Sequence, residues 1–388
     1  MEAYLDNAAT TRVFDSVKDI MVESMCVEFG NPSSKHRKGM EAELDIKKAT
    51  EIIAKSLKVD AKELIFTSGG TESNNMALIG TALANNRAGK HIITTVTEHA
   101  SVHNPLLFLE QQGFRITFVS VDSLGRVNLE ELLDAICEDT ILVSVMMVNN
   151  EIGSVNDVAH ISKMIKSKKP DVLFHVDAIQ AYGKYVIYPK RMGIDLLSIS
   201  GHKIHGPKGS GVLFVRDKVK IKPLIYGGEQ QRGMRSGTEN VPAIVGLGKA
   251  VEEIYKDHEK KRAYLYELKK ALISALQQIE GVTVNGYKEG IDITETAPHV
   301  VSASFENVRS EVLLHALEDK GVYVSSGSAC SSNHPGLSGT LVAIQVEQQL
   351  LDSTIRFSFS VNTTIEEINY AVEMLKELLP KLRLFTRK

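Results

Sequence analysis

The sequence predicts an α/β protein in which a doubly wound, mostly parallel sheet is followed by a smaller α+β domain. Short runs of β-branched and apolar residues alternate with helical patterns up to about residue 255, as in parallel α/β folds. Several runs are apolar almost throughout, which is typical of strands covered on both faces. Beyond residue 255 the alternation ends, and a charged helical stretch leads into a different order of elements.

Seven strands are expected in the first part of the chain. In a parallel sheet of this kind, a ligand site lies beyond the carboxyl ends of the strands. The sequence therefore predicts that functional side chains directly follow the strands. The seven runs are 63–67, 91–95, 115–120, 141–148, 172–176, 196–200 and 211–215.

The remaining elements belong to the predicted smaller domain. They are a charged helix over 252–276, strands at 282–285 and 300–305, and helices at 310–320 and 364–379.

The chain is long enough for two domains. We assign residues 16–255 to a large domain that holds the expected ligand site and residues 256–388 to a small C-terminal domain. Residues 1–15 are expected to form an N-terminal segment that packs with the small domain.

Charge and composition exclude several classes of protein. With 45 Lys and Arg against 48 Asp and Glu, the net charge of −3 does not favour nucleic acid as a partner. The longest apolar runs, such as residues 143–148, are too short to span a bilayer, and the chain does not open with a secretion signal. We therefore expect a soluble, cytoplasmic protein.

The three cysteines, Cys26, Cys137 and Cys330, are widely spaced and odd in number. They form no Cys-x-x-Cys or Cys/His cluster, so the sequence predicts neither a metal site nor a disulfide framework, and a reducing cytoplasm fits. Cys26 and Cys137 sit in helical patterns, where burial as small hydrophobic residues is expected. Cys330 lies among the small polar residues of 325–333, which favours an exposed, nucleophilic thiol.

The most informative segment is 198–209, where a strand ends in hydroxyl, glycine and basic residues. Lys203 can bind the aldehyde of a cofactor covalently, while Ser200 and His202 hold its phosphate. A second buried strand ends at Asp177, an acid suited to the ring nitrogen of pyridoxal 5'-phosphate. Together the lysine and the aspartate predict a pyridoxal-phosphate enzyme.

Gly70 and Thr71 lie in a glycine-containing turn between a strand and a helix. The turn is either a simple connection capped by Thr71 or a phosphate site, because a helix N-terminus offers free N–H groups. Since Ser200 and His202 end another strand, we favour phosphate binding.

Four further polar residues follow or lie within strand-like runs. His99 is either an ordinary histidine or one that stacks on the cofactor ring and moves protons. Asn150 either caps the next turn or, together with Gln180, bonds the phenolic oxygen of the cofactor. Arg356 needs an anionic partner, from the protein or from a ligand.

These segments resemble the class V aminotransferase family of pyridoxal-phosphate enzymes, and most closely its cysteine desulfurases of the NifS/IscS type. The resemblance runs nearly end to end. Residues 325–330 are its most specific part, because they distinguish this group from relatives with a shorter cysteine loop. The other matching segments are 4–11, 29–34, 97–99, 148–153, 200–206 and 234–238.

The resemblance implies a fold-type-I homodimer with active sites at the subunit interface. It implies that pyridoxal phosphate is attached to Lys203, with Asp177 at the ring nitrogen and His99 stacked on the ring. The remaining implied contacts are Asn150 and Gln180 with the phenolic oxygen, Gly70, Thr71, Ser200, His202 and the other subunit's Thr238 with the phosphate, and Arg356, helped by Asn31, with the substrate carboxylate.

The implied reaction removes sulfur from L-cysteine, which leaves L-alanine and a persulfide on Cys330. A sulfur-acceptor protein in iron–sulfur cluster assembly, tRNA thiolation or thiamin synthesis would take the sulfur. Residues 333–339 and Asn74, where many relatives carry aspartate, depart from the family pattern. The alternatives are another class V reaction, such as transamination or selenocysteine lysis, and a non-catalytic cofactor-binding scaffold.

Overall fold

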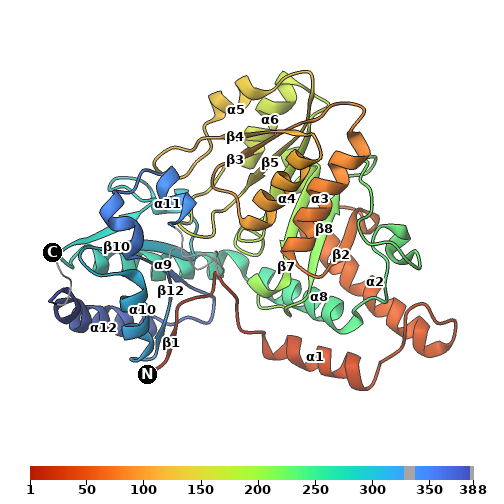
Figure 1. Ribbon diagram of the computed structural model, residues 1–388. Helices are drawn as coiled ribbons and strands as arrows, with labels where there is room; N and C mark the ends of the chain where they lie inside the picture. Colours follow the sequence, from red (N-terminus) through yellow and green to blue (C-terminus); the bar gives the residue numbers. More distant parts are fainter. Residues whose placement is uncertain (327–336, 385–388) are drawn as a thin grey trace.

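The computed structural model describes residues 1–326 and 337–384, in which a large sheet and a smaller one lie side by side (Figure 1). The large sheet has seven strands in the order β2, β8, β7, β6, β5, β3, β4. Strand β8 runs antiparallel to both of its neighbours, and the other adjacent strands are parallel. This confirms the predicted, mostly parallel sheet. The strands are β2 (Leu64–Thr67), β3 (His91–Thr95), β4 (Arg115–Val119), β5 (Thr140–Met146), β6 (Leu173–Asp177), β7 (Leu196–Ser200) and β8 (Gly211–Val215).

Apolar side chains alternate between the two faces of this sheet, and each face has its own core. Leu196 and Leu213 belong to the core under α3 and α4, whereas Leu197 and Phe214 belong to the core on the opposite face. Because both faces are covered, the strands read as nearly continuous apolar runs. The helices are α1 (Asp15–Cys26), α2 (Arg37–Leu57), α3 (Gly70–Asn85), α4 (Ala100–Gln111), α5 (Leu129–Ala135), α6 (Val158–Lys168), α7 (Pro189–Met192) and α8 (Val241–Tyr255).

The smaller sheet is antiparallel, with the strand order β12, β13, β10, β9. A separate apolar core joins it to its helices. The short strand β1 (Ala3–Tyr4) pairs with β11 (Val322–Tyr323), so the chain begins against this core. The proposed boundaries at residues 15 and 255 stay a prediction. The other elements are α9 (His258–Leu276), β9 (Val282–Asn285), β10 (Val300–Phe305), α10 (Ser310–Glu318), β12 (Ser325–Ser326), α11 (Gly339–Ala343), β13 (Thr354–Ser358) and α12 (Ile365–Arg383).

Two local predictions were wrong. The helix expected over 252–276 is broken between α8 and α9, where Asp257 takes a left-handed conformation with φ of 52°. Cys26 and Cys137 are exposed rather than buried. Cys26 is the last residue of α1 and lies outside the buried side of that helix, and Cys137 follows α5 in the turn before β5, so neither side chain packs against the core.

The edge strand β2 is covered by a side chain instead of another strand. The amide of Gln231 accepts a hydrogen bond from Phe66 N (2.6 Å) and donates one to Phe66 O (2.8 Å). Arg232 donates to Leu64 O (3.1 Å). Both residues are left-handed, with φ of 48° and 61°, a conformation that side chains other than glycine, asparagine and aspartate rarely adopt.

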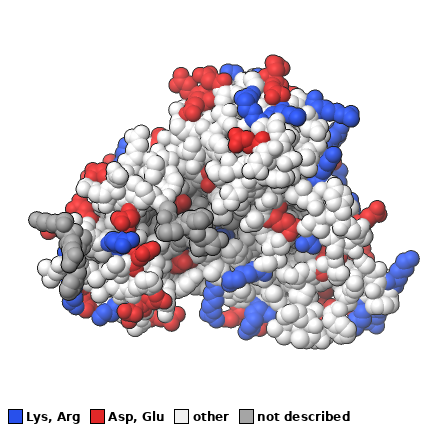
Figure 2. Space-filling view, in the orientation of Figure 1, with Lys and Arg blue, Asp and Glu red and all other residues white. Residues whose placement is uncertain are grey.

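Acidic and basic side chains are interspersed over the face of the molecule shown in Figure 2, in keeping with the nearly balanced composition. Among the described helices, none is long and apolar enough to cross a membrane.

Candidate active site

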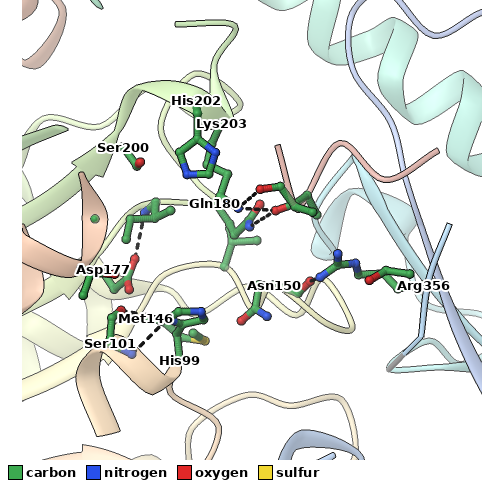
Figure 3. Close-up of a pocket in the computed structure, with 17 residues that line it drawn as sticks. His99, Ser101, Met146, Asn150, Asp177, Gln180, Ser200, His202, Lys203 and Arg356 are labelled. Carbon is green, nitrogen blue, oxygen red and sulfur yellow. Dashed lines mark hydrogen bonds between the residues drawn. The ribbon is translucent and has the colours of Figure 1, made fainter. Parts of the chain in front are cut away.

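A cavity of about 310 Å³ lies where the parallel strands of the large sheet end. Strands β5, β6 and β7 contribute their last residues, Met146, Asp177 and Ser200. Figure 3 shows Asp177 and Ser200 on one side of this space and Arg356 on the other. Ten residues singled out in the sequence line it: Gly70, Thr71, His99, Asn150, Asp177, Gln180, Ser200, His202, Lys203 and Arg356.

Lys203 lies in the turn η2 (Gly201–Lys203) that directly follows β7. Its Nζ donates hydrogen bonds to the carbonyl oxygens of Ala8 (2.5 Å) and Ala9 (2.7 Å), so the N-terminal segment closes one side of the site. Its own carbonyl oxygen accepts from the buried Lys184 Nζ at 2.6 Å. The Lys203 amine is therefore held by main-chain oxygens from a distant part of the sequence.

Asp177 is buried at the end of β6 and has two hydrogen-bond donors. Ile179 N donates to Oδ1 (2.9 Å), and Asn74 Nδ2 donates to Oδ2 (2.8 Å). Burial raises the pKa of Asp177, while these donors, His99 and Lys203 favour the carboxylate. A cationic ring placed against this carboxylate would be stabilised in its protonated form.

His99 is half-buried at the N-terminus of α4. Its Nδ1 accepts from Ser101 N (3.1 Å) and lies 2.8 Å from Ser101 Oγ. Burial lowers the pKa of His99, and Lys203 adds to this, against an opposing effect of Asp177. The neutral imidazole, with its proton on Nε2, therefore faces the cavity.

The turn between β2 and α3 and the end of β7 form a cradle that fits a phosphate. Ser200 Oγ is buried without a hydrogen-bond partner, so it is available to bond a polar ligand such as a phosphate oxygen. A Cβ at Gly70 would lie 2.2 Å from Ile179 Cδ1 and 3.6 Å from Ser200 Cβ, so only glycine leaves this approach open. The N-terminus of α3 supplies N–H groups that favour an anion.

Two neutral groups complete this part of the cavity. Burial, reinforced by Lys203, lowers the pKa of His202 to about 4, so its ring is an uncharged hydrogen-bonding group. Gln180 is buried, and its Nε2 donates to Ala8 O (3.0 Å) while its Oε1 lies 3.1 Å from His299 Nε2. His299 therefore acts as the donor to Gln180.

Arg356 brings a positive charge from the small sheet into the cavity. It lies in β13, and its Nη2 contacts Asp6 Oδ1 (2.7 Å) while its Nη1 donates to Asn150 O (3.0 Å). Its Nε is buried without a hydrogen-bond partner. A planar guanidinium with a donor to spare suits recognition of a carboxylate.

Two predicted residues of the described part of the chain, Asn31 and Thr238, do not line this cavity. Asn31 and Thr238 are exposed elsewhere on the chain, and Asn31 Oδ1 accepts from Ser33 N (2.9 Å). Cys330 lies outside the described residues, although Ser325, in β12, lines the cavity. Within the described ranges, no group of three or more His, Cys, Asp or Glu side chains is arranged to hold a metal ion.

Several residues in the cavity wall or directly behind it were not singled out from the sequence. The main-chain carbonyls of Ala8 and Ala9 accept hydrogen bonds from Lys203. In the sequence these two residues were marked only by their place in the matching segment 4–11. Ser101 stands next to the matching segment 97–99, but nothing in the sequence linked it to His99. His299, behind Gln180, had no local signal at all.

The aminotransferase class-V family model matches residues 3–370 of this chain. The chain belongs to the class-V aminotransferase family. A curated relative in it is the cysteine desulfurase IscS of Dictyoglomus turgidum, which is 43% identical over 98% of this chain and 95% of the relative.

Solved structures support the same family placement. A NifS-like protein superposes with a TM-score of 0.92 at 38% identity, over 98% of this chain and all of the other. A structure described as SspA in complex with cysteine superposes with a TM-score of 0.80 at 33% identity, over 93% of this chain and all of the other. The fold-type-I prediction and the family resemblance are confirmed. The cavity also fits the pyridoxal phosphate on which the family depends.

Proposed function

We propose that this protein is a cysteine desulfurase that converts L-cysteine to L-alanine and carries the sulfur as a persulfide on Cys330. The observation that carries the proposal is that Lys203, Asp177 and Arg356 line the same cavity. Asp177 ends β6, Lys203 follows β7, and Arg356 lies in β13 of the smaller sheet. The match to curated cysteine desulfurases over almost the whole chain supports the same activity.

Pyridoxal phosphate, when bound, would supply an electron sink for the bonds broken at the substrate. Asp177 would hold the ring nitrogen, and Gly70, Thr71, Ser200 and His202 would hold the phosphate. Asn150 and Gln180 would meet the phenolic oxygen with their amides. Each of these residues lines the cavity.

Arg356 would bind the carboxylate of L-cysteine and thereby fix the substrate amine near Lys203. The Lys203 amine would take the proton from the substrate Cα and return a proton to the substrate-derived carbon. His99, neutral and with its proton on Nε2, would act as a second acid or base close to the ring.

The transfer of sulfur from the substrate to Cys330 needs no outside oxidant. The Cys330 thiolate attacks the substrate sulfur, so an S–S bond forms while the C–S bond breaks and its electron pair stays with carbon. Protonation of that carbon gives L-alanine, and the enzyme keeps a persulfide. An acceptor protein of iron–sulfur assembly, tRNA thiolation or thiamin synthesis would then take the outer sulfur.

We also propose that the protein acts as a homodimer. Exposed apolar side chains gather near the end of α1 and the start of α2, including Phe29, Met40 and Leu44, and such a surface is expected to be covered. Pairing would let Thr238 of one subunit reach the phosphate site of the other. Asn31 would then lie near the bound substrate.

We place this activity in the cytoplasm. Cys26 and Cys137 are both exposed free thiols, and such thiols persist in a reducing compartment.

The test measures alanine and sulfide formed from L-cysteine with a thiol reductant present. Cys330→Ala is compared with Cys137→Ala, which removes an exposed thiol from another place. We expect equal amounts of alanine and sulfide from the wild type and from Cys137→Ala, and almost none from Cys330→Ala. Equal alanine from all three proteins would refute the role of Cys330 and favour a lyase. Keto-acid products would favour an aminotransferase, and bound cofactor without turnover would favour a scaffold.

A further inference from the structure

Four polar side chains at the cavity form one continuous hydrogen-bonded chain. Asn74 Nδ2 donates to Asp177 Oδ2 (2.8 Å) and to Ser101 Oγ (2.9 Å). Ser101 Oγ in turn lies 2.8 Å from His99 Nδ1, a contact visible in Figure 3. Asn74 comes from α3 and Ser101 from α4, and both are buried.

The donors in this chain allow only one arrangement of protons. The main-chain N–H of Ser101 can only donate, so His99 Nδ1 must be the acceptor and carry no proton. The Ser101 hydroxyl must therefore also donate to Nδ1, which leaves its oxygen to accept from Asn74. The proton of the neutral His99 is confined to Nε2.

The Asn74 amide is held in one orientation by the same reasoning. The Asp177 carboxylate accepts hydrogen bonds, so the amide nitrogen must face it. Rotating the amide would bring Oδ1 against that carboxylate. Asn74 Oδ1 stays buried without a partner, which indicates that the two bonds of the nitrogen decide the orientation.

We propose that Asn74 and Ser101 are positioning residues that couple Asp177 to His99, so that Asp177 stays a carboxylate and His99 keeps its proton on Nε2. The roles of Asp177 and His99 toward the cofactor rest on the proposed function, whereas the coupling itself does not. An aspartate at position 74 cannot serve both neighbours, because it would place a second carboxylate beside Asp177. The asparagine that departs from the family pattern is thus matched to Ser101.

The test follows the His99 pKa by NMR in the full-length holoenzyme labelled with ¹⁵N-histidine, with the His99 signal assigned by its loss in His99→Gln. Ser101→Thr and Ser101→Val form the decisive pair, because they have the same shape and differ in the hydroxyl. Removing a donor to the neutral ring favours its protonation. We expect Ser101→Val to raise the His99 pKa by about 0.5–1 pH unit, and Ser101→Thr to keep it near the wild-type value.

A second readout is the pH titration of the visible absorbance of the resting cofactor. Asn74→Asp should shift this titration by about one pH unit or more, since two adjacent carboxylates share a proton. The matched control is Asn285→Ala, because Asn285 is also a buried asparagine that donates to two serine hydroxyls, at 3.3 and 2.9 Å, in the small sheet. It should move neither titration.

Equal His99 pKa values in Ser101→Val and Ser101→Thr would overturn the coupling. So would an Asn74→Asp absorbance titration identical to that of Asn285→Ala. Failure of the proposed function would look different, because the wild type would then form no alanine from L-cysteine while the NMR difference between the position-101 variants persisted.

Discussion

Two buried lysines should make the stability of this protein rise with pH. Lys184 donates to Lys203 O (2.6 Å), and Lys269 donates to Thr296 Oγ1 and Ala297 O (both 2.7 Å). Burial lowers the pKa of each from 10.5 to about 7, with a further contribution from Lys203 at Lys184. Neither ammonium has a carboxylate partner among its hydrogen bonds.

The number of protons bound in the folded and unfolded states decides whether the free energy of unfolding rises or falls with pH. Between about pH 7 and pH 10.5 the unfolded chain binds a proton at each lysine that the folded protein does not bind. The free energy of unfolding therefore rises with pH in this window. Each lysine contributes about 1.4 kcal/mol for every pH unit, so moving from pH 8 to pH 9 should add that amount per lysine.

The assay compares Lys184→Met and Lys269→Met with the wild type by urea unfolding at pH 8 and pH 9. Each variant should lose about 1.4 kcal/mol of the increase seen in the wild type. The two variants control for each other, because only Lys184 contacts Lys203, so only Lys184→Met should also change the cofactor absorbance. An unchanged increase from pH 8 to pH 9 in both variants would refute the reasoning.

Two further predictions concern the cavity. A Cβ at Gly70 would lie 2.2 Å from Ile179 Cδ1, so Gly70→Ala should displace Ile179, which lines the cavity, and weaken cofactor binding about 5–100-fold. A titration of the apoprotein with pyridoxal phosphate, followed by absorbance, measures the affinity. An unchanged affinity would contradict a phosphate site at Gly70. Arg356→Lys keeps the charge but loses the fork that spans Asp6 and Asn150, so KM for L-cysteine should rise about 10–100-fold with a smaller change in kcat. A lower kcat at constant KM would argue against a role in carboxylate binding.

The parts of the site predicted from sequence share one physical cause. Asp177 and Ser200 end apolar strands, and in a parallel sheet such positions meet at one edge. A polar residue placed there stands out against the buried run before it. The same contrast identified Lys203 and Asn150, which follow strands within a few residues.

The parts that escaped prediction depend on contacts between distant segments. The carbonyls of Ala8 and Ala9 have no side-chain signature, yet they bind the Lys203 amine. Asn74 and Ser101 lie on different helices, and their contact follows from how α3 packs on α4. The break at Asp257 depends on a left-handed residue that the helical pattern does not reveal.

The loop that covers β2 has a consequence for how the molecule associates with others. An open edge strand presents unpaired N–H and C=O groups that can recruit a strand from another chain. At this edge, Gln231 forms hydrogen bonds with both the N–H and the C=O of Phe66, and Arg232 donates to the carbonyl oxygen of Leu64. The short loop that leads to Thr238 thus also prevents another chain from adding a strand at β2. A change that disrupts this loop would expose the edge of the sheet to aggregation and would displace Thr238 at the same time.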